Sequence, residues 1–391
     1  MFTKKEKTII SLLFCIHFVM IIDFMIIMPM APHLMNLFSI DAQQLSLLIT
    51  TFTLAAGLIG LASAKILDRF DRKLTLLIAV IGFIAGNIGC ASATDFWSFT
   101  IARGVTGSFV GIIGSLMLAI ISDAIPLEKR GKAIGLVMSA LALASIIGVP
   151  FCLFLYQKIS WSAPFWFLTI CSIIFLIAMI FFMPNFISHL RSAQKARLLQ
   201  TREQKFSVFF IIFLILGHFT INPFLFVSLI QNAKIPESHL TPLYLCAGLG
   251  SIVSSILSGY WVDKFGFKKV FKISLLLSLL SLFWVTHFTA ANLILATASV
   301  TTFFIFMGAR MTAAMTWVTS HAQLENRGAF MSLINSFQHL SAAVAALIAG
   351  QIVQKTPTGE ILHFEYVGYV AIAFSLVALY IPLKIEKKVA S

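Results

Sequence analysis

Charged residues are scarce in this chain of 391 residues. Asp, Glu, Lys and Arg make up 11% of the sequence and apolar residues 59%, against roughly 25% and 45–50% in ordinary soluble domains. Such a composition excludes a soluble globular protein. A membrane-spanning helix needs about 20 apolar residues, so twelve would use about 240 positions and leave the rest for loops and ends. The composition therefore predicts a polytopic helical membrane protein.

Cysteines and catalytic motifs are also sparse. The five cysteines all fall in apolar stretches and have no spacing typical of a metal site, which argues against a disulfide framework. The sequence has neither the H-E-x-x-H motif of zinc hydrolases nor the G-x-x-x-x-G-K-[ST] motif that binds nucleotide phosphates. We therefore expect no enzyme activity, no ATP-driven pump, no cofactor and no metal.

Long apolar runs are what the sequence has in abundance. Twelve runs of at least 18 residues lie between charges or turn residues, and each is long enough to cross a bilayer as a helix. The expected fold class is an all-α membrane protein with twelve transmembrane helices. The runs lie near residues 8–31, 45–66, 74–93, 97–121, 133–156, 164–184, 206–230, 241–262, 270–290, 293–319, 328–353 and 365–383.

The positive charges are distributed unevenly between the two sides of the membrane. If both termini are cytoplasmic, 23 of the 28 Lys and Arg residues fall in cytoplasmic segments. The outer loops hold only Lys158, Lys234 and Lys355, and the spans hold Arg103 and Arg310. Because Lys and Arg concentrate on the cytoplasmic side, this asymmetry predicts the orientation in the cytoplasmic membrane of a bacterium. The net charge of +13 then belongs to the membrane surface, and no nucleic-acid partner is expected.

Two charged motifs recur at nearly the same offset. Residues 68–70 read Asp-Arg-Phe and residues 263–265 read Asp-Lys-Phe, 195 positions later. Residues 128–131 read Glu-Lys-Arg-Gly and residues 325–328 read Glu-Asn-Arg-Gly, 197 positions later. Equivalent loops at one offset indicate two parallel halves of six helices. The predicted domains are an N-terminal bundle at 1–184, a cytoplasmic linker at 185–205 and a C-terminal bundle at 206–391.

These loops resemble those of the major facilitator superfamily, over essentially the whole chain. The motifs are Asp68-Arg69-x-x-Arg72-Lys73, Gly259-x-x-x-Asp263-Lys264-Phe265-Gly266-x-Lys268-Lys269 and Arg103-x-x-x-Gly107. Ala64 and Asp71 stand where the family usually has glycine. The chain looks most like the family's bacterial proton-coupled drug exporters. The resemblance implies two pseudo-symmetric six-helix bundles around a central cavity, the major facilitator fold, and alternating access. It also implies a cytoplasmic gate of charged helix ends, formed by Asp68, Arg69, Arg72, Asp263, Lys264 and Lys268.

Small residues spaced four apart form stripes on spans 2, 5, 8 and 11. Helices associate in lipid where small residues let their backbones approach closely. In the family, span 2 meets span 11 and span 5 meets span 8 across the two halves, and exporters often carry a Gly-Pro motif in span 5. A general abundance of small residues in membrane helices is the alternative explanation. The predicted helix-interface residues are Gly60, Ala64, Gly148, Pro150, Gly259, Ala346 and Gly350.

Asp23 is the only carboxylate deep within a span, where an aspartate costs about 2.5–3.5 kcal/mol to insert. It lies about 12 Å from the outer end of span 1, and Arg103 lies about 9 Å from the outer end of span 4. Because the family resemblance places spans 1 and 4 side by side, we expect the two side chains to pair. A carboxylate that gains and loses this partner would couple a proton to transport. A static structural pair is the alternative.

Five further polar residues within the spans are candidates for the substrate cavity. A neutral His218 would bind substrate or relay a proton, and a hydrogen-bonded packing role is its alternative. Arg310 lies nearer the cytoplasm, where it would snorkel, close an inner gate, bind an anionic ligand or anchor its helix on carbonyl groups. Pro29 and Pro32 are expected to free backbone carbonyls just outward of Asp23. The predicted cavity residues are His218, Asn222, Arg310, Gln338 and His339.

The favoured function is a secondary transporter that exchanges a small molecule for protons, with Asp23 and Arg103 as the coupling residues. A proton symporter that imports a nutrient or a metal chelate is the open alternative, and an intramembrane enzyme or a channel fits less well. The expected partners are the transported molecule, protons and the lipid bilayer. No oligomer signal is visible, and a monomer is expected.

Overall fold

The structure, a computed structural model, describes residues 2–66, 70–185, 199, 201–322, 327–356 and 359–386, with only the backbone described at 64–66, 127 and 383–386. Twelve helices in these ranges are long and apolar enough to cross a membrane, which confirms the predicted all-α membrane fold. Ten crossings are single helices, nine of which are α1 (Lys4–Leu37), α2 (Ala42–Ile66), α3 (Arg72–Ala91), α4 (Phe96–Ala124), α8 (Ala163–Phe182), α11 (Leu240–Phe265), α12 (Phe267–Thr286), α13 (Leu293–Ser320) and α14 (Arg327–Ile352).

The other three crossings are α15 (Phe364–Glu386), which is also a single helix, and two that are assembled from pieces. The fifth crossing joins α5 (Leu127–Met138), α6 (Ala140–Leu143), a π-helical turn (Ala144–Gly148) and α7 (Val149–Lys158); the seventh joins α9 (Arg202–Phe219) and α10 (Asn222–Gln231). A short 3-10 turn (Glu237–His239) precedes α11, and a two-stranded antiparallel hairpin of β1 (Gln354–Lys355) and β2 (Ile361–Leu362) joins α14 to α15.

Contacts group the chain into two compact units. Unit 1 comprises Met1–Ile26, Thr51–Leu198 and Ala322–Leu340, and unit 2 comprises Ile27–Thr50, Leu199–His321 and Ser341–Ser391. Three helices, α1, α2 and α14, contribute to both units, because each packs against different neighbours along its length. The division into bundles at 184 and 206 remains a prediction from the sequence repeat.

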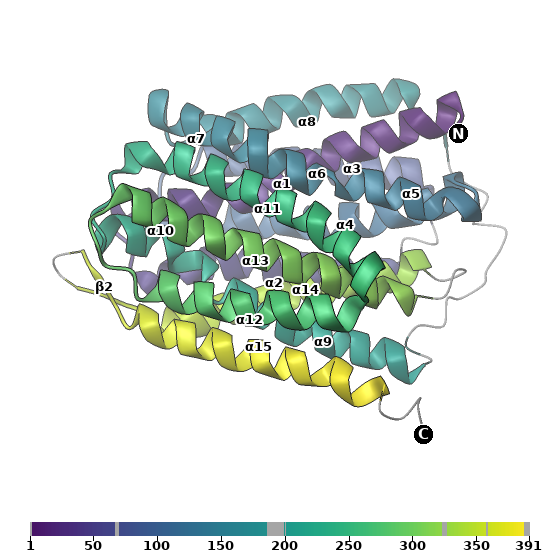
Figure 1. The fold of residues 1–391 in the computed structure, drawn as a ribbon. Helices are drawn as coiled ribbons and strands as arrows, with labels where there is room; N and C mark the ends of the chain where they lie inside the picture. The colour runs from purple at the N-terminus through teal and green to yellow at the C-terminus, as the bar shows by residue number, and fades with distance from the viewer. Residues whose placement is uncertain are drawn as a thin grey trace. The chain divides into compact units, whose positions relative to one another are not determined.

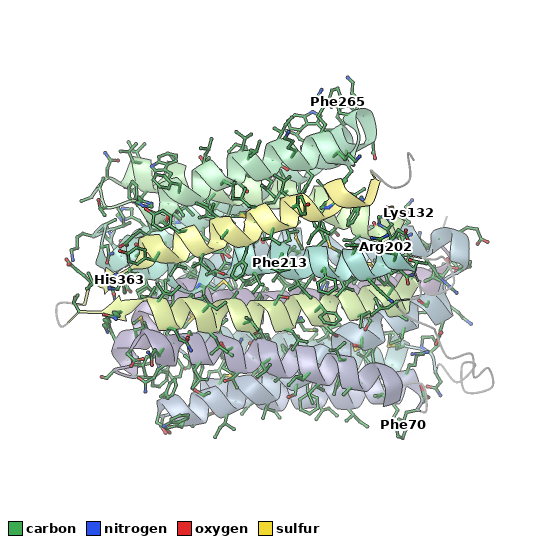
Figure 2. All side chains as sticks on the ribbon, turned by 90° about the horizontal axis from the view of Figure 1, so that it is seen from below. Phe70, Lys132, Arg202, Phe213, Phe265 and His363 are labelled. Carbon is green, nitrogen blue, oxygen red and sulfur yellow. The ribbon has the colours of Figure 1, made fainter. Side chains whose placement is uncertain are left out.

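In unit 1, α3 packs against both α4 and α8. Glycine makes the first contact close: at Gly86 on α3, an added Cβ would lie 2.9 Å from the backbone nitrogen of Thr106 on α4. Backbones that approach to this degree are typical of helix pairs in lipid. The ends of the unit are visible in Figure 2, where Phe70 and Lys132 lie toward the same end.

In unit 2, α13 packs against α11 and α12, and α15 packs against α9 and α12 (Figure 1). Serine hydroxyls of α11 bond to α13 carbonyl oxygens: Ser254 to Ile305 and Ser258 to Ala309, both at 2.8 Å. In lipid such bonds hold helices together where apolar contact alone does not. The unit has two distinct ends, because Arg202 and Phe265 lie toward one end and His363 toward the other (Figure 2).

Local sequence explains where several helices begin and end. Asp95 caps α4 by accepting from the backbone N–H groups of Trp97 and Ser98, while the Ser98 hydroxyl accepts from the Asp95 backbone N–H. This reciprocal arrangement satisfies N–H groups that have no partner within the helix. Gly266 ends α11 with a φ of 80°, a conformation that glycine adopts without a steric penalty. The loop motif therefore needs a glycine at this turn.

Proline interrupts two crossings and leaves a third unbroken. The fifth crossing forms its π-helical turn directly before Val149 and Pro150, and Pro150 is buried. The seventh crossing breaks between α9 and α10, just before Pro223. Pro29 and Pro32 do not break span 1, because α1 continues through both to Leu37; the freed carbonyls expected outward of Asp23 stay a prediction. Each proline removes only one backbone donor, and packed neighbours support the helix on either side.

Helices α2 and α14 contact each other through small residues in both units. In unit 1, a Cβ on Gly60 would lie 2.9 Å from Ser336 Oγ. In unit 2, a Cβ on Gly350 would lie 2.5 Å from Ser46 Cβ, and Ala346 is buried. Spans 2 and 11 therefore meet, as their stripes predict. The side chain of Ala64 lies outside the described residues.

The stripes of spans 5 and 8 have neighbours within their own units. Gly148 faces α1, where an added Cβ would lie 2.5 Å from Ile22 Cγ1. Ser251 on α11 faces Gly308 on α13, where an added Cβ would lie 2.7 Å from the serine Oγ. Gly259 has open space, with no described atom within 4 Å of an added Cβ. Part of the span 8 stripe thus serves packing inside unit 2, and the pairing of spans 5 and 8 stays a prediction.

Candidate functional site

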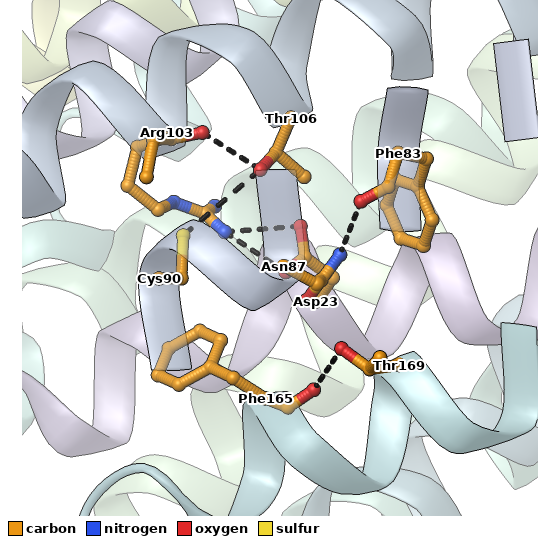
Figure 3. A network of polar contacts seen from close by, with 9 residues as sticks. Asp23, Phe83, Asn87, Cys90, Arg103, Thr106, Phe165 and Thr169 are labelled. Carbon is orange, nitrogen blue, oxygen red and sulfur yellow. Dashed lines mark hydrogen bonds and ion pairs between the residues drawn. The ribbon is translucent and has the colours of Figure 1, made fainter. Parts of the chain in front are cut away.

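Asp23 on α1 and Arg103 on α4 form an ion pair inside unit 1 (Figure 3). Arg103 Nη1 donates to both carboxylate oxygens of Asp23 at 3.0 Å. The Asp23 side chain is 0% exposed and the Arg103 side chain is 2% exposed. The expected contact is therefore present. Because removing two charges from water is costly, such a pair persists only while each charge compensates the other.

An aromatic ring covers the guanidinium of Arg103. The Cζ atom lies 4.1 Å from the ring centroid of Phe52 on α2, a cation–π contact. Helix α2 can come this close because Gly107, one turn beyond Arg103, has no side chain: an added Cβ would lie 2.9 Å from Phe52 Cα. The Arg103-x-x-x-Gly107 motif thus supplies a charge and, one turn later, the space for the helix that carries its aromatic partner.

The ring contacts continue from Phe52 to α14. Phe24, the residue after Asp23, stacks on Phe52 with centroids 5.6 Å apart. His339, in the part of α14 that belongs to unit 1, meets Phe24 edge to face at 6.3 Å. His17 lies close enough to His339 to interact with it electrostatically, and its Nδ1 is 3.0 Å from the carbonyl oxygen of Val137. His339, expected in the substrate cavity, is therefore connected to the Arg103 guanidinium through Phe24 and Phe52, by two ring–ring contacts and the cation–π contact.

Three polar residues of the same network were not found by sequence reasoning. Asn87 on α3 is fully buried; its Nδ2 donates to Phe83 O at 3.2 Å, while its Oδ1 has no hydrogen-bond partner among the described residues. Cys90, one turn later, lies with its Sγ 3.9 Å from Thr106 Oγ1 on α4 (Figure 3). The only signal in the sequence was an amide within the apolar third span.

Arg310 on α13 is fully buried inside unit 2, as Arg103 is inside unit 1. Its Nη1 donates to Ser278 Oγ on α12 and to Ser375 Oγ on α15, both at 3.1 Å. Its Nη2 has no partner among the described residues. The expected snorkelling toward the cytoplasm and the anchoring on carbonyls are wrong in this structure, because hydroxyl groups of neighbouring helices hold the side chain inside the bundle.

The remaining cavity candidates are divided between the units. His218, the next-to-last residue of α9, is half-buried, contacts the Phe303 ring at 6.3 Å and feels the charge of Arg310. Asn222 begins α10 and is buried. Gln338, in the unit 1 part of α14, is half-buried. The structure thus places His218 near Arg310 in unit 2. Gln338 lies next to His339 in unit 1.

The predicted gate residues lie at helix ends, where the structure describes them. Arg72 at the start of α3 pairs with Asp123 near the end of α4, a partner that sequence reasoning missed. Asp263, Lys264 and Lys268 are exposed around the turn between α11 and α12. Asp68 and Arg69 lie outside the described residues. Arg72 therefore acts within unit 1, and the clamp between helices expected for the other gate residues stays a prediction.

Comparison with known proteins adds the family. The family model described as Major Facilitator Superfamily matches residues 13–233 and 206–390. The uncharacterized MFS-type transporter YceJ of Bacillus subtilis (strain 168) is 26% identical over 94% of both chains. A probable sugar efflux transporter of Helicobacter acinonychis (strain Sheeba) is 22% identical over 58% of this chain and 59% of its own.

A solved structure has the same fold over nearly the full length. It is a bacterial homologue of the human lysosomal transporter Spinster in an inward-facing, occupied conformation, with a TM-score of 0.75 at 15% identity, and the match covers 99% of this chain and 98% of that chain. At this identity the likeness concerns the fold. Since the family model covers most of the sequence, the chain belongs to the Major Facilitator Superfamily and is a multi-pass membrane transporter for a small-molecule substrate.

Proposed function

We propose that the protein is a proton-coupled secondary active transporter that exports a small molecule in exchange for protons by alternating access. The buried pair of Asp23 and Arg103 carries this proposal. Among the described residues, the only other buried carboxylate is Glu6, near the start of α1. A titratable group deep in a span is expensive to maintain and commonly marks a proton pathway. Asp23 is therefore the proton acceptor in this account.

Protonation of Asp23 would change what Arg103 binds. The neutral acid no longer attracts the guanidinium as an ion, while the Phe52 ring still stacks on the guanidinium. Asn87 Oδ1 is an unused acceptor in the same network, and it would take a hydrogen bond from a rearranged donor. Proton binding to Asp23 is thus coupled to the release of Arg103.

The neighbours of Asp23 in the chain connect this event to other helices. Ile22 contacts Gly148 in the π-helical turn of the fifth crossing, and Phe24 contacts Phe52 and His339. Single π-helical turns occur frequently at functional sites, because they distort easily. A small shift of α1 at Asp23 would therefore directly reach the π-helical turn, α2 and α14.

Export is the proposed direction. The relatives described as probable sugar efflux transporters support it, as does the Gly148-Val149-Pro150 sequence in the fifth crossing. We further propose that the protein is a monomer in the bacterial cytoplasmic membrane with both termini cytoplasmic, as the distribution of Lys and Arg indicates. The charged residues at the ends of α3, α4 and α11 would then form the cytoplasmic gate.

The test begins with a compound screen in cells that lack or overproduce the protein, scored by accumulation. A compound found in this way is then applied to proteoliposomes that contain a pH-sensitive dye. We expect uphill movement of the compound opposite to protons. Asp23→Asn should abolish uphill movement and proton flux while downhill exchange of the compound continues. Asp95→Asn, which changes an exposed carboxylate at a helix cap, is the matched control and should behave as the wild type.

Each alternative has its own result. Protons that move in the same direction as the compound would establish the symport alternative. Movement of the compound only down its own gradient, in either direction and without proton flux, would favour a channel. Coupling that survives in Asp23→Asn would remove Asp23 from the mechanism and leave the pair with a structural role.

A further inference from the structure

Arg310 has an incomplete set of partners. The guanidinium is fully buried in unit 2 and donates through Nη1 to two serine hydroxyls, while Nη2 has no partner among the described residues. None of the described carboxylates lies within ion-pair distance of it. The side chain is therefore a buried cation held by neutral groups alone.

Neutral hydroxyls do not replace a counter-ion. A charge taken out of water is stabilised mainly by an opposite charge with good geometry, and an unpaired buried charge is strongly unfavourable. Arg103 has such a partner in Asp23, at 3.0 Å. The unused Nη2 donor of Arg310 is the position where a negatively charged acceptor would bind.

The two serines differ in what they leave available. The Ser278 hydroxyl already donates to Leu275 O at 2.7 Å. The Ser375 hydroxyl accepts from Arg310 and donates to none of the described residues. Gly217 on α9 lets α15 approach at this point, since an added Cβ would lie 3.1 Å from the Ser375 backbone nitrogen. Ser375 thus offers one O–H beside the free Nη2.

His218 is a third polar side chain in this neighbourhood. It follows Gly217, is half-buried, and lies close enough to Arg310 to interact with its charge. Neither of its ring nitrogens bonds to a described residue, so the imidazole is available as a third hydrogen-bonding group. The polar groups near Arg310 therefore come from three neighbouring helices: Ser278 on α12, Ser375 on α15 and His218 on α9.

We propose that Arg310 and Ser375, with His218 beside them, form the recognition site for a carboxylate group of the transported molecule. Two donors beside one buried positive charge fit a planar monoanion, whereas a doubly charged phosphate would need more compensation than one guanidinium supplies. This inference rests on the transporter function proposed above and adds the class of substrate, an organic monoanion. It makes no use of Asp23.

The experiment compares acids with amides of the same shape. Purified full-length protein in lipid nanodiscs is heated with acetate or acetamide, hexanoate or hexanamide, benzoate or benzamide, and 1-naphthoate or 1-naphthamide, at constant ionic strength. Apparent affinities follow from the midpoint shifts. A hydrogen bond to a charged group contributes enough to change affinity about tenfold or more. We therefore expect at least one acid to bind about tenfold more tightly than its amide.

Variants assign that preference to the site. Arg310→Gln should reduce it to less than about threefold, Arg310→Lys should keep part of it, and Ser375→Ala should weaken it more than Ser278→Ala, because the Ser278 proton is already used. Arg202→Gln, which changes an exposed cation at the start of α9, is the matched control. If Arg310→Gln does not fold, the two serine variants and Arg310→Lys still decide the question.

Two results would overturn the proposal: equal stabilisation, or none, by acids and amides in all four pairs, and a preference for acids that survives in Arg310→Gln. Asp23→Asn separates this inference from the proton mechanism, because it should lose coupling and keep the preference for acids. A wild-type protein that prefers acids but moves no protons would refute only the proton mechanism.

Discussion

Two buried arginines occupy the two units and have opposite surroundings. Arg103 has a carboxylate at 3.0 Å and an aromatic ring at 4.1 Å. Arg310 has two hydroxyl groups at 3.1 Å and no carboxylate partner among the described residues, although each guanidinium has one nitrogen without a described partner, Nε in Arg103 and Nη2 in Arg310. The repeat of six and six crossings therefore does not duplicate the charges. In the proposed mechanism, a proton neutralises the internal counter-ion of Arg103, whereas a counter-ion from outside binds at Arg310.

Their positions along the helices account for the difference. Arg103 is the eighth residue of α4, whereas Arg310 is the eighteenth of α13. At the rise of about 1.5 Å per residue, Arg103 lies about 10 Å and Arg310 about 25 Å from the start of its own helix. Arg103 therefore meets α1 at Asp23, and Arg310 meets serines on α12 and α15.

Breaking the pair of unit 1 should have the largest effect. Arg103→Gln leaves the Asp23 carboxylate buried without its partner, which should lower the free energy of unfolding by about 3–5 kcal/mol. The double variant Asp23→Asn with Arg103→Gln removes both charges and should recover most of that loss without recovering uphill transport. Denaturant unfolding in detergent micelles measures the stability of the single and the double variant. A double variant as unstable as Arg103→Gln would contradict the compensation of the two charges.

Displacing the helix that covers Arg103 should have the next largest effect. Gly107→Ala forces a methyl group against the backbone at Phe52, and we expect a loss of about 1–3 kcal/mol in the free energy of unfolding. Gly259→Ala is the matched control, since it places the same group in open space; it should be neutral or stabilise α11 by up to about 1 kcal/mol. Thermal unfolding of the two variants side by side provides the measurement, and equal midpoints would refute the close contact.

Removing the arginine of unit 2 should cost less than removing that of unit 1. Arg310→Gln gives up two hydrogen bonds to hydroxyls but also removes a buried charge without a counter-ion. The free energy of unfolding should change by less than about 1.5 kcal/mol. The same denaturant titration as for Arg103→Gln tests this. A loss as large as that of Arg103→Gln would mean that the guanidinium of Arg310 is already compensated, which contradicts the proposed site.

A surface carboxylate should show the smallest effect and a defined pH dependence. The backbone N–H of Ser98 holds the pKa of the Asp95 carboxyl below its usual value. A lowered folded-state pKa contributes stability above the unfolded-state pKa of about 3.9, and this contribution is lost as the pH falls through the folded value. Asp95→Asn should thus be slightly less stable than the wild type near neutral pH and equal to it in acid. Melting curves across pH test this, and a gap that widens in acid would contradict the sign.

The sequence was sufficient for the spans and for one contact of the site. Apolar length and the charges between runs define the twelve crossings, and the matched depths of Asp23 and Arg103 predicted their pairing. The partners of Arg72 and Arg310 were missed, because Asp123, Ser278 and Ser375 are separated from them in sequence by tens of residues and lie on other helices. Asn87 and Phe52 were missed for the same reason. Which residues face each other depends on helix rotation, and apolar runs without polar faces do not reveal rotation.

The central claim is that Asp23 gains and loses a proton during transport. Infrared difference spectroscopy of the protein in lipid, recorded as the pH is lowered, detects the carbonyl stretch of a protonated carboxylic acid. We expect a component of this band in the wild type and in Asp95→Asn that is missing in Asp23→Asn and that appears at higher pH in Arg103→Gln, where the opposing cation is gone. A spectrum that Asp23→Asn leaves unchanged would contradict the account.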